Sequence, residues 1–188
     1  MKLEKVVKQT NNKFLNMFTA NYKTENGKEY NYFFCSRREN KIGDLSVCDA
    51  VKVLPYIKET NEIIFIKNFR YAVNDYVYEL PAGLVDANED LIEAAKRELN
   101  EETGATVYRI EEMSEIGTTS VGLTDETIKL YYAYVKLDNK QNLDEYENIK
   151  VVKININDIN EFLKTHKVDI ISQLMVKIFE KELLLSCF

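Results

Sequence analysis

The stretch GLVDANEDLIEAAKRELNEETGA, Gly83–Ala105, supplies the first convincing helix pattern in the chain. Asp90 is placed as an N-cap with Glu93 three residues later, as in a capping box, and Gly104 fits the left-handed position that ends a helix. The stretch therefore predicts a helix over roughly Leu91–Thr103. Three glutamates occupy its last turns, although the dipole at a helix C-terminus disfavours negative charge.

These three acids, Glu98, Glu101 and Glu102, border the predicted core face of the helix. At about 100° per residue, that face collects the apolar side chains of Leu91, Ile92, Ala95 and Leu99. Glu98 and Glu102 are i,i+4 neighbours, with Cβ atoms roughly 5–6 Å apart. Desolvation beside the core makes their repulsion costly, and a divalent cation would remove that cost. Periodicity alone leaves two interpretations open, a metal site or a charged, solvated face.

Carboxylate ligands favour a hard ion, Mg²⁺ or Mn²⁺, with water and substrate phosphates completing the octahedron. Arg97 is placed to pair with Glu101 or to reach back to Glu89, and so to hold the acids. The pattern therefore contains both the ligands and a residue that orients them.

Strand patterns surround the helix. The stretches 14–24 and 29–37 flank the turn signal Asn26-Gly27 and predict a hairpin. Further strands are predicted at 49–57, 62–73, 76–80, 113–121, 127–137 and 149–156, and helices begin near Asn157 and Asp169, each with an Asx N-cap. We expect an N-terminal β unit at 1–45 and an α/β body at 46–188. Because two strands alone are marginal in water, the N-terminal unit must pack on the body or on a second chain.

Composition excludes several classes of protein. The 188 residues carry a net charge of -6 with a pI of about 5.1, which argues against a nucleic-acid partner. The three cysteines form no CxxC pair (Cys35, Cys48 and Cys187). The chain has one histidine, so a multi-histidine metal site is impossible, and this residue, His166, lies where a helix is predicted to end. The chain start lacks the apolar region of a signal peptide, and no apolar run approaches the ~20 residues of a membrane span. We expect a cytoplasmic protein with no membrane partner.

The spacing of the central stretch identifies a family resemblance. Gly83, five residues, Glu89, seven residues and then RELNEETGA (97–105) resembles the Nudix box at every specified position. YELPAGLVD (78–86), SVGLTDE (120–126) and DEYENIKVVKI (144–154) are similar to segments of the ADP-ribose pyrophosphatase branch. The resemblance implies an α/β fold, an α/β/α sandwich around a mixed sheet, with an N-terminal antiparallel β subdomain through which members usually form homodimers.

The resemblance also implies Mg²⁺-dependent hydrolysis of a nucleoside diphosphate linked to another moiety, such as ADP-ribose, giving a nucleoside monophosphate and a sugar phosphate. By matching position, Glu98 and Glu102 would ligate the metal with the carbonyl of Ala82, and Glu101 would ligate or support it. Arg97 and Glu89 would orient the other groups, and Gly83 would lie at the substrate.

The remaining expected site residues lie outside the box. In this branch the catalytic base often lies on a late loop, here NLDEYENIK (142–150), where Glu145 is the first candidate and Glu147 the second. The resemblance places Arg70 at the substrate phosphates. Tyr30 or Tyr32 on the N-terminal hairpin is expected to stack on adenine.

One departure puts the substrate in doubt. The branch usually has proline at the position of Val121 as a marker of ADP-ribose hydrolysis. A GDP-sugar or a dinucleoside polyphosphate is therefore an alternative substrate. A Nudix domain that senses a nucleotide without cleaving it is a further alternative, although such domains usually lose the box acids that are kept here.

Overall fold

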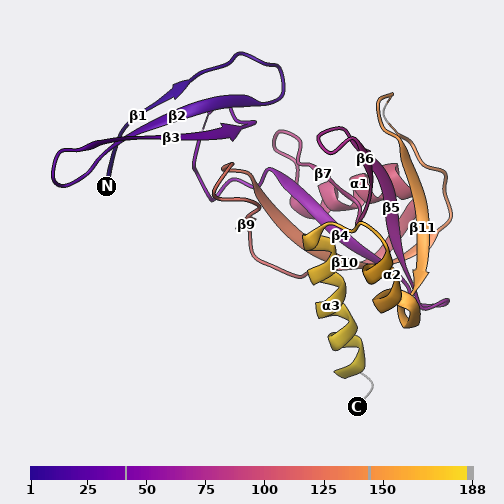
Figure 1. The fold of residues 1–188 in the computed structure, drawn as a ribbon. Helices are drawn as coiled ribbons and strands as arrows, with labels where there is room; N and C mark the ends of the chain where they lie inside the picture. Colours follow the sequence, from indigo (N-terminus) through magenta and orange to yellow (C-terminus); the bar gives the residue numbers. More distant parts are fainter. Residues whose placement is uncertain (41, 144, 186–188) are drawn as a thin grey trace. The chain divides into compact units, whose positions relative to one another are not determined.

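The computed structural model describes residues 1–40, 42–143 and 145–185. The chain divides into two compact units, one of Met1–Asp49 with Ile116–Ile128 and one of Ala50–Glu115 with Lys129–Phe188 (Figure 1). The predicted domain boundary after residue 45 remains a prediction. The segment 116–128 joins the N-terminal unit although no shift in composition separates it from its neighbours.

The N-terminal unit contains a three-stranded antiparallel sheet in the order β1 (Lys2–Lys8), β2 (Asn16–Lys23) and β3 (Glu29–Ser36). The predicted hairpin is confirmed, because β2 and β3 pair across a turn in which Gly27 has φ 79°. Strand β1 was not predicted. It lies at the sheet edge, and most of its side chains, lysines among them, are exposed, so it lacks a periodic apolar signal.

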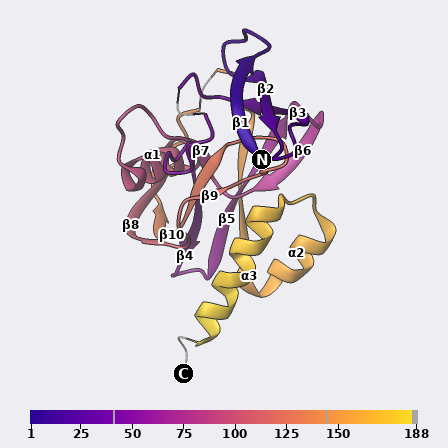
Figure 2. The same ribbon diagram turned by 90° about the vertical axis from the view of Figure 1, so that its left-hand side faces the viewer.

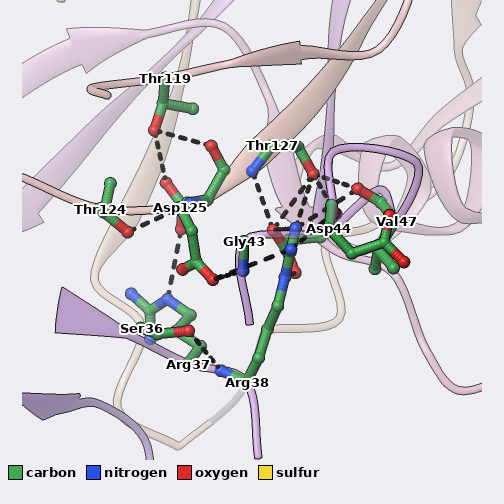
Figure 3. A network of polar contacts seen from close by, with 12 residues as sticks. Ser36, Arg37, Arg38, Gly43, Asp44, Val47, Thr119, Thr124, Asp125 and Thr127 are labelled. Atoms are coloured by element: carbon green, nitrogen blue, oxygen red, sulfur yellow. Dashed lines mark hydrogen bonds and ion pairs between the residues drawn. The ribbon is translucent and has the colours of Figure 1, made fainter. Parts of the chain in front are cut away.

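A buried arginine holds this unit together (Figure 3). Arg38 binds both carboxylate oxygens of Asp49, through Nε at 2.8 Å and Nη2 at 2.6 Å. Its Nη1 donates to the carbonyl of Asp44 at 2.8 Å, and its Nη2 donates to Thr127 Oγ1 at 3.1 Å. The hydrogen bonds to Asp49 raise the pKa of Arg38. This network joins the segment 116–128 to the chain around residue 49.

The second unit is built on a large sheet with the central order β11-β5-β4-β10-β8. The strands are β4 (Ala50–Ile57), β5 (Glu62–Arg70), β6 (Asp75–Glu79), β7 (Ala82–Leu84), β8 (Ala105–Glu112), β10 (Thr127–Leu137) and β11 (Ile149–Asn155). Strand β6 pairs with β5, β7 pairs with β4, and the short β9 (Gly117–Thr118) pairs with the first residues of β10. Strand β8 was not predicted, and the predicted strand 113–121 is reduced to β9.

Helices cover both faces of this sheet. Helix α1 (Leu91–Thr103) lies on one face, and α2 (Ile159–Thr165) and α3 (Ile170–Leu185) lie on the other (Figures 1 and 2). Residues of α1 share one buried cluster with β4, β8 and β10, while residues of α2 and α3 share a second with β4 and β5. The predicted α/β sandwich is confirmed. None of the helices in the described ranges combines the length and the hydropathy that crossing a bilayer requires.

The smaller predictions had mixed outcomes. A short 3-10 turn, η1 (Ile156–Asp158), is capped by Asn155 and precedes α2, whose N-cap position is held by the Asx residue Asp158 without a side-chain hydrogen bond. Asp169 accepts a hydrogen bond from Ser172 N at the start of α3, as predicted. His166 is the C-cap of α2, as expected. The Cys35 thiol donates to the carbonyl of Leu123 at 3.3 Å, and Cys187 lies outside the described residues.

Candidate active site

Helix α1 has the predicted bounds and caps. Asp90 Oδ1 accepts hydrogen bonds from Ile92 N at 2.9 Å and Glu93 N at 3.2 Å, and Gly104 has φ 73°. The Glu93 carboxylate accepts from Lys96 Nζ at 2.8 Å, so within the described chain the reciprocal half of the predicted capping box is not seen. The helix buries Ala94, Ala95 and Leu99 completely, which turns its glutamate-bearing side toward β7.

Strand β7 lies directly beside the glutamates. Ala82 N donates to Glu102 Oε2 at 2.9 Å. The Glu98 carboxylate occupies the space beside Gly83, where an added Cβ would lie 1.9 Å from Glu98 Cδ. Glycine at position 83 therefore leaves the space that the Glu98 carboxylate occupies, and an added Cβ would displace that carboxylate.

Arg97 organises the acids at the helix surface. Its Nε and Nη2 bind the two oxygens of Glu89 at 2.8 and 2.9 Å. Its Nη1 reaches Glu98 at 2.8 Å and Glu101 at 3.2 Å. Both predicted pairings of Arg97 are present, and one guanidinium connects three carboxylates. Hydrogen bonds from Arg97, and then from Asp86 N, lower the pKa of Glu89 to about 2.

The inner acids are in a different environment. Glu102 is only 4% exposed, and burial, with Glu98, Glu147 and Glu79 nearby, raises its pKa to about 8. Burial also raises the pKa of Glu98 despite its contact with Arg97. These carboxylates are crowded and desolvated, which is costly unless a positive charge joins them.

The acids line a cavity of about 470 Å³. Its walls are formed by Ala82, Gly83, Leu84, Asp86, Arg97, Glu98, Glu101, Glu102, Asn142 and Glu147. Within the described ranges, no three carboxylate, thiol or imidazole side chains are already gathered as a ligand set. The donor chemistry nevertheless fits a hard divalent cation, because the crowded oxygens of Glu98 and Glu102 face one cavity and repel one another when both groups are ionised.

The late loop also contributes to this cavity. Of the two predicted candidates for the base, Glu147 lines the cavity and Glu145 does not, although both residues are exposed. Glu147 is close enough to the inner acids to raise the pKa values of Glu98 and Glu102. The geometry therefore brings Glu147 to the box acids.

Arg70 lies at the end of β5 and is held by a buried acid. Its Nε and Nη2 bind the two oxygens of Glu79 at 2.8 and 2.6 Å, and its side chain remains half exposed. Hydrogen bonds to Glu79 raise the pKa of Arg70, and the charge of Glu102 contributes. The arginine is thus fixed near the inner acids, with part of its surface open.

Tyr30 and Tyr32 belong to the N-terminal unit. Tyr32 donates its hydroxyl hydrogen bond to the carbonyl of Gly122 at 2.7 Å, and Tyr30 is half exposed. Tyr32 lines an apolar cavity of about 240 Å³ together with Val121, which is 72% exposed. The expected stacking of Tyr30 or Tyr32 on adenine remains a prediction.

Three residues of this site were missed by the sequence analysis. Glu79 holds Arg70, Asn142 lines the cavity, and Gln141 donates to the backbone of α1. An acid at the end of a predicted strand, two residues before Pro81, was a usable signal for Glu79. Asn142 and Gln141 lie in a polar loop with no periodic pattern, so their placement depends on tertiary contacts.

This chain is similar to a known protein family and to a solved structure. The model of the NUDIX domain family matches residues 48–174, more than half of the chain. The structure superposes on a crystal structure of an ADP compounds hydrolase with a TM-score of 0.69, covering 85% of this chain and 82% of that one. At 20% sequence identity this likeness shows the fold.

Sequence relatives indicate the branch. An ADP-ribose pyrophosphatase of Bacillus subtilis is 31% identical over 121 residues, which are 63% of this chain and 64% of that protein. A methanol dehydrogenase activator of Bacillus methanolicus is 32% identical over 123 residues, with 63% and 64% coverage. An ADP-ribose pyrophosphatase of Saccharomyces cerevisiae is 38% identical over 100 residues, 52% of this chain and 43% of that protein. The matches span less than two thirds of these relatives' lengths. The chain belongs to the NUDIX family and resembles its ADP-ribose pyrophosphatases, as the box predicted.

Proposed function

We propose that the chain is a Nudix pyrophosphatase that hydrolyses the diphosphate of ADP-ribose or a related nucleoside diphosphate sugar. Water adds its oxygen to one phosphorus, and the bond from that phosphorus to the bridging oxygen breaks, giving a nucleoside monophosphate and a sugar phosphate. The observation that carries this proposal is the cavity in which the buried carboxylate of Glu102 lies beside Glu98. The similarity to ADP-ribose pyrophosphatases of Bacillus subtilis and Saccharomyces cerevisiae supports it.

A divalent cation, Mg²⁺ with Mn²⁺ as a possible substitute, would be held by Glu98, Glu102 and the carbonyl of Ala82, with Glu101 in support. When bound, it would offset the phosphate charge that develops during displacement. Arg97 keeps Glu98 and Glu101 on the cavity side of the helix, and Glu89 anchors Arg97 from behind. Gly83 leaves the space that the Glu98 carboxylate occupies.

Glu147 is the base in this proposal. Its position on the cavity wall favours it over Glu145, and a carboxylate there can accept the proton of the attacking water. A positioned general base is typically worth about 10²–10⁴-fold in rate. Replacing Glu147 with glutamine should lower the rate by that range, whereas Glu145→Gln should leave it within about twofold.

Recognition of the substrate involves charge and aromatic surface. The open side of Arg70 would contact the phosphates while Glu79 holds its other edge. Tyr30 or Tyr32 would stack on the nucleobase of the substrate. Because Val121 replaces the usual proline and lines a cavity of the N-terminal unit, a GDP-sugar or a dinucleoside polyphosphate is the second candidate substrate.

Product analysis tests this function. Incubation with ADP-ribose and Mg²⁺ should give AMP and ribose 5-phosphate, and chelation of the metal should abolish both products. If ADP-ribose is untouched, a panel of GDP-sugars, UDP-sugars and dinucleoside polyphosphates tests the alternative. Tight binding of a nucleotide without turnover across the whole panel would leave the nucleotide sensor as the function.

Assembly and location complete the proposal. We expect a homodimer formed through the N-terminal β unit and a cytoplasmic location, with no nucleic-acid or membrane partner. Sedimentation of the full chain over a range of concentrations tests the dimer. A monomer at all concentrations would contradict it.

A further inference from the structure

The last turn of α1 is capped by a neighbouring loop in a way that the box does not require. A helix leaves its final carbonyls without partners inside the helix, and α1 has no basic residue in its last turn. Gly104 N satisfies the carbonyl of Asn100 at 2.7 Å. The next carbonyls are satisfied by the loop between β10 and β11, which also carries Glu147.

Three hydrogen bonds join the loop to the helix end. Asn142 N donates to the carbonyl of Glu101 at 2.8 Å, and Asn139 N donates to the carbonyl of Gly104 at 3.0 Å. Between them, Gln141 Nε2 donates to the carbonyl of Glu102 at 2.7 Å. The loop is therefore bound to the backbone of the residues whose side chains form the acid cavity.

Gln141 makes one contact that Asn139 and Asn142 do not make in this set of hydrogen bonds. Its Nε2 also reaches the carbonyl of Ile149 at 3.4 Å, at the start of β11 and two residues after Glu147. Both partners are acceptors, so only the NH₂ group of the amide can serve them together. One side chain thus connects the backbone of Glu102 to the strand that follows Glu147.

We infer that Gln141 is a positioning residue for the reaction, acting through Glu147. This inference rests on the proposed function. Gln141 sets the separation between the metal-binding end of α1 and the loop carrying the base, without touching the substrate. Misplacement of a reacting group by 1 Å can cost about 10²-fold in rate, so one hydrogen-bonding side chain is sufficient to matter.

Gln141→Leu keeps the size of the side chain and removes both hydrogen bonds. Position 141 is exposed, but the two freed carbonyls belong to the buried residues Glu102 and Ile149, so we expect the melting temperature to fall by several degrees while the protein still folds. We expect kcat to fall by about 10- to 100-fold, with KM and the Mg²⁺ midpoint changed by less than about threefold. Lys140→Ala, at an exposed neighbour in the same loop, is the matched control and should resemble wild type.

A double-mutant cycle separates positioning from a general structural effect. If Gln141 acts through Glu147, Gln141→Leu should slow the wild-type enzyme but add almost nothing to Glu147→Gln. Equal slowing in both backgrounds, or no slowing in the wild-type background, would overturn the inference while the proposed function stands. A wild-type protein with no turnover on any substrate of the panel would overturn both.

Discussion

Two clusters of buried charge differ in how their charge is balanced. In the N-terminal unit, Arg38 binds Asp49 with two hydrogen bonds and two backbone carbonyls besides. In the second unit, the Glu102 carboxylate accepts from Ala82 N and is crowded by Glu98 and Glu147. A balanced buried cluster fits a structural role, whereas an unbalanced acidic one fits a site that receives a cation.

The largest expected effect concerns the acidic cluster. Glu102→Gln should lower turnover with Mg²⁺ by about 10³-fold, since metal stabilisation of the transition state is worth several kcal/mol. The same change should leave the melting temperature equal or higher, because it removes a crowded buried charge. Product formation and thermal unfolding of the same preparation check both parts. A clear drop in melting temperature would contradict the comparison.

The balanced cluster should respond in the opposite way. Arg38→Leu should lower the free energy of unfolding by about 3 kcal/mol, since it leaves Asp49 partly buried without its cation. Denaturant unfolding measures this change. Arg38→Lys, which keeps the charge but loses the two-pronged geometry, should lose less. A leucine variant as stable as wild type would show that the network does not hold the unit together.

A smaller effect tests the close approach in the acidic cluster. Gly83→Ala places a Cβ where the Glu98 carboxylate lies, and the flexible end of Glu98 must move. We expect about a 10²-fold loss in rate with little change in stability. Gly117→Ala is the control, because its added Cβ meets nothing within 4 Å. Equal rates for the two variants would remove the reason given for glycine at position 83.

The smallest effect depends on pH. The pKa of Glu89 falls from an ordinary 4.5 to about 2 on folding, so its ionised form stabilises the native state. That contribution is complete above about pH 5 and disappears as the pH falls through 2. The stability difference between wild type and Glu89→Gln should therefore shrink between pH 5 and pH 2. A constant difference over this range would show that Arg97 is not held by Glu89 in solution.

The sequence by itself determined the helix, its caps and the box acids, because these depend on spacing along one helix. The hairpin at Asn26-Gly27 and strand β10 were predictable for the same reason, since turn chemistry and alternation are local signals. Strands β1 and β8 were not, because their apolar pattern is weak.

Only the tertiary structure decided which loop groups meet the helix. It placed Glu147 on the cavity wall, brought Glu79 to Arg70 and set Gln141 against the carbonyl of Glu102. It also joined the segment 116–128 to the N-terminal unit through Arg38 and Thr127. Gln141 and Glu102, like Arg38 and Thr127, are far apart in sequence, and polar loops carry no periodicity that would identify their partners. Glu79 and Arg70 are closer in sequence, but they meet only because β5 pairs with β6.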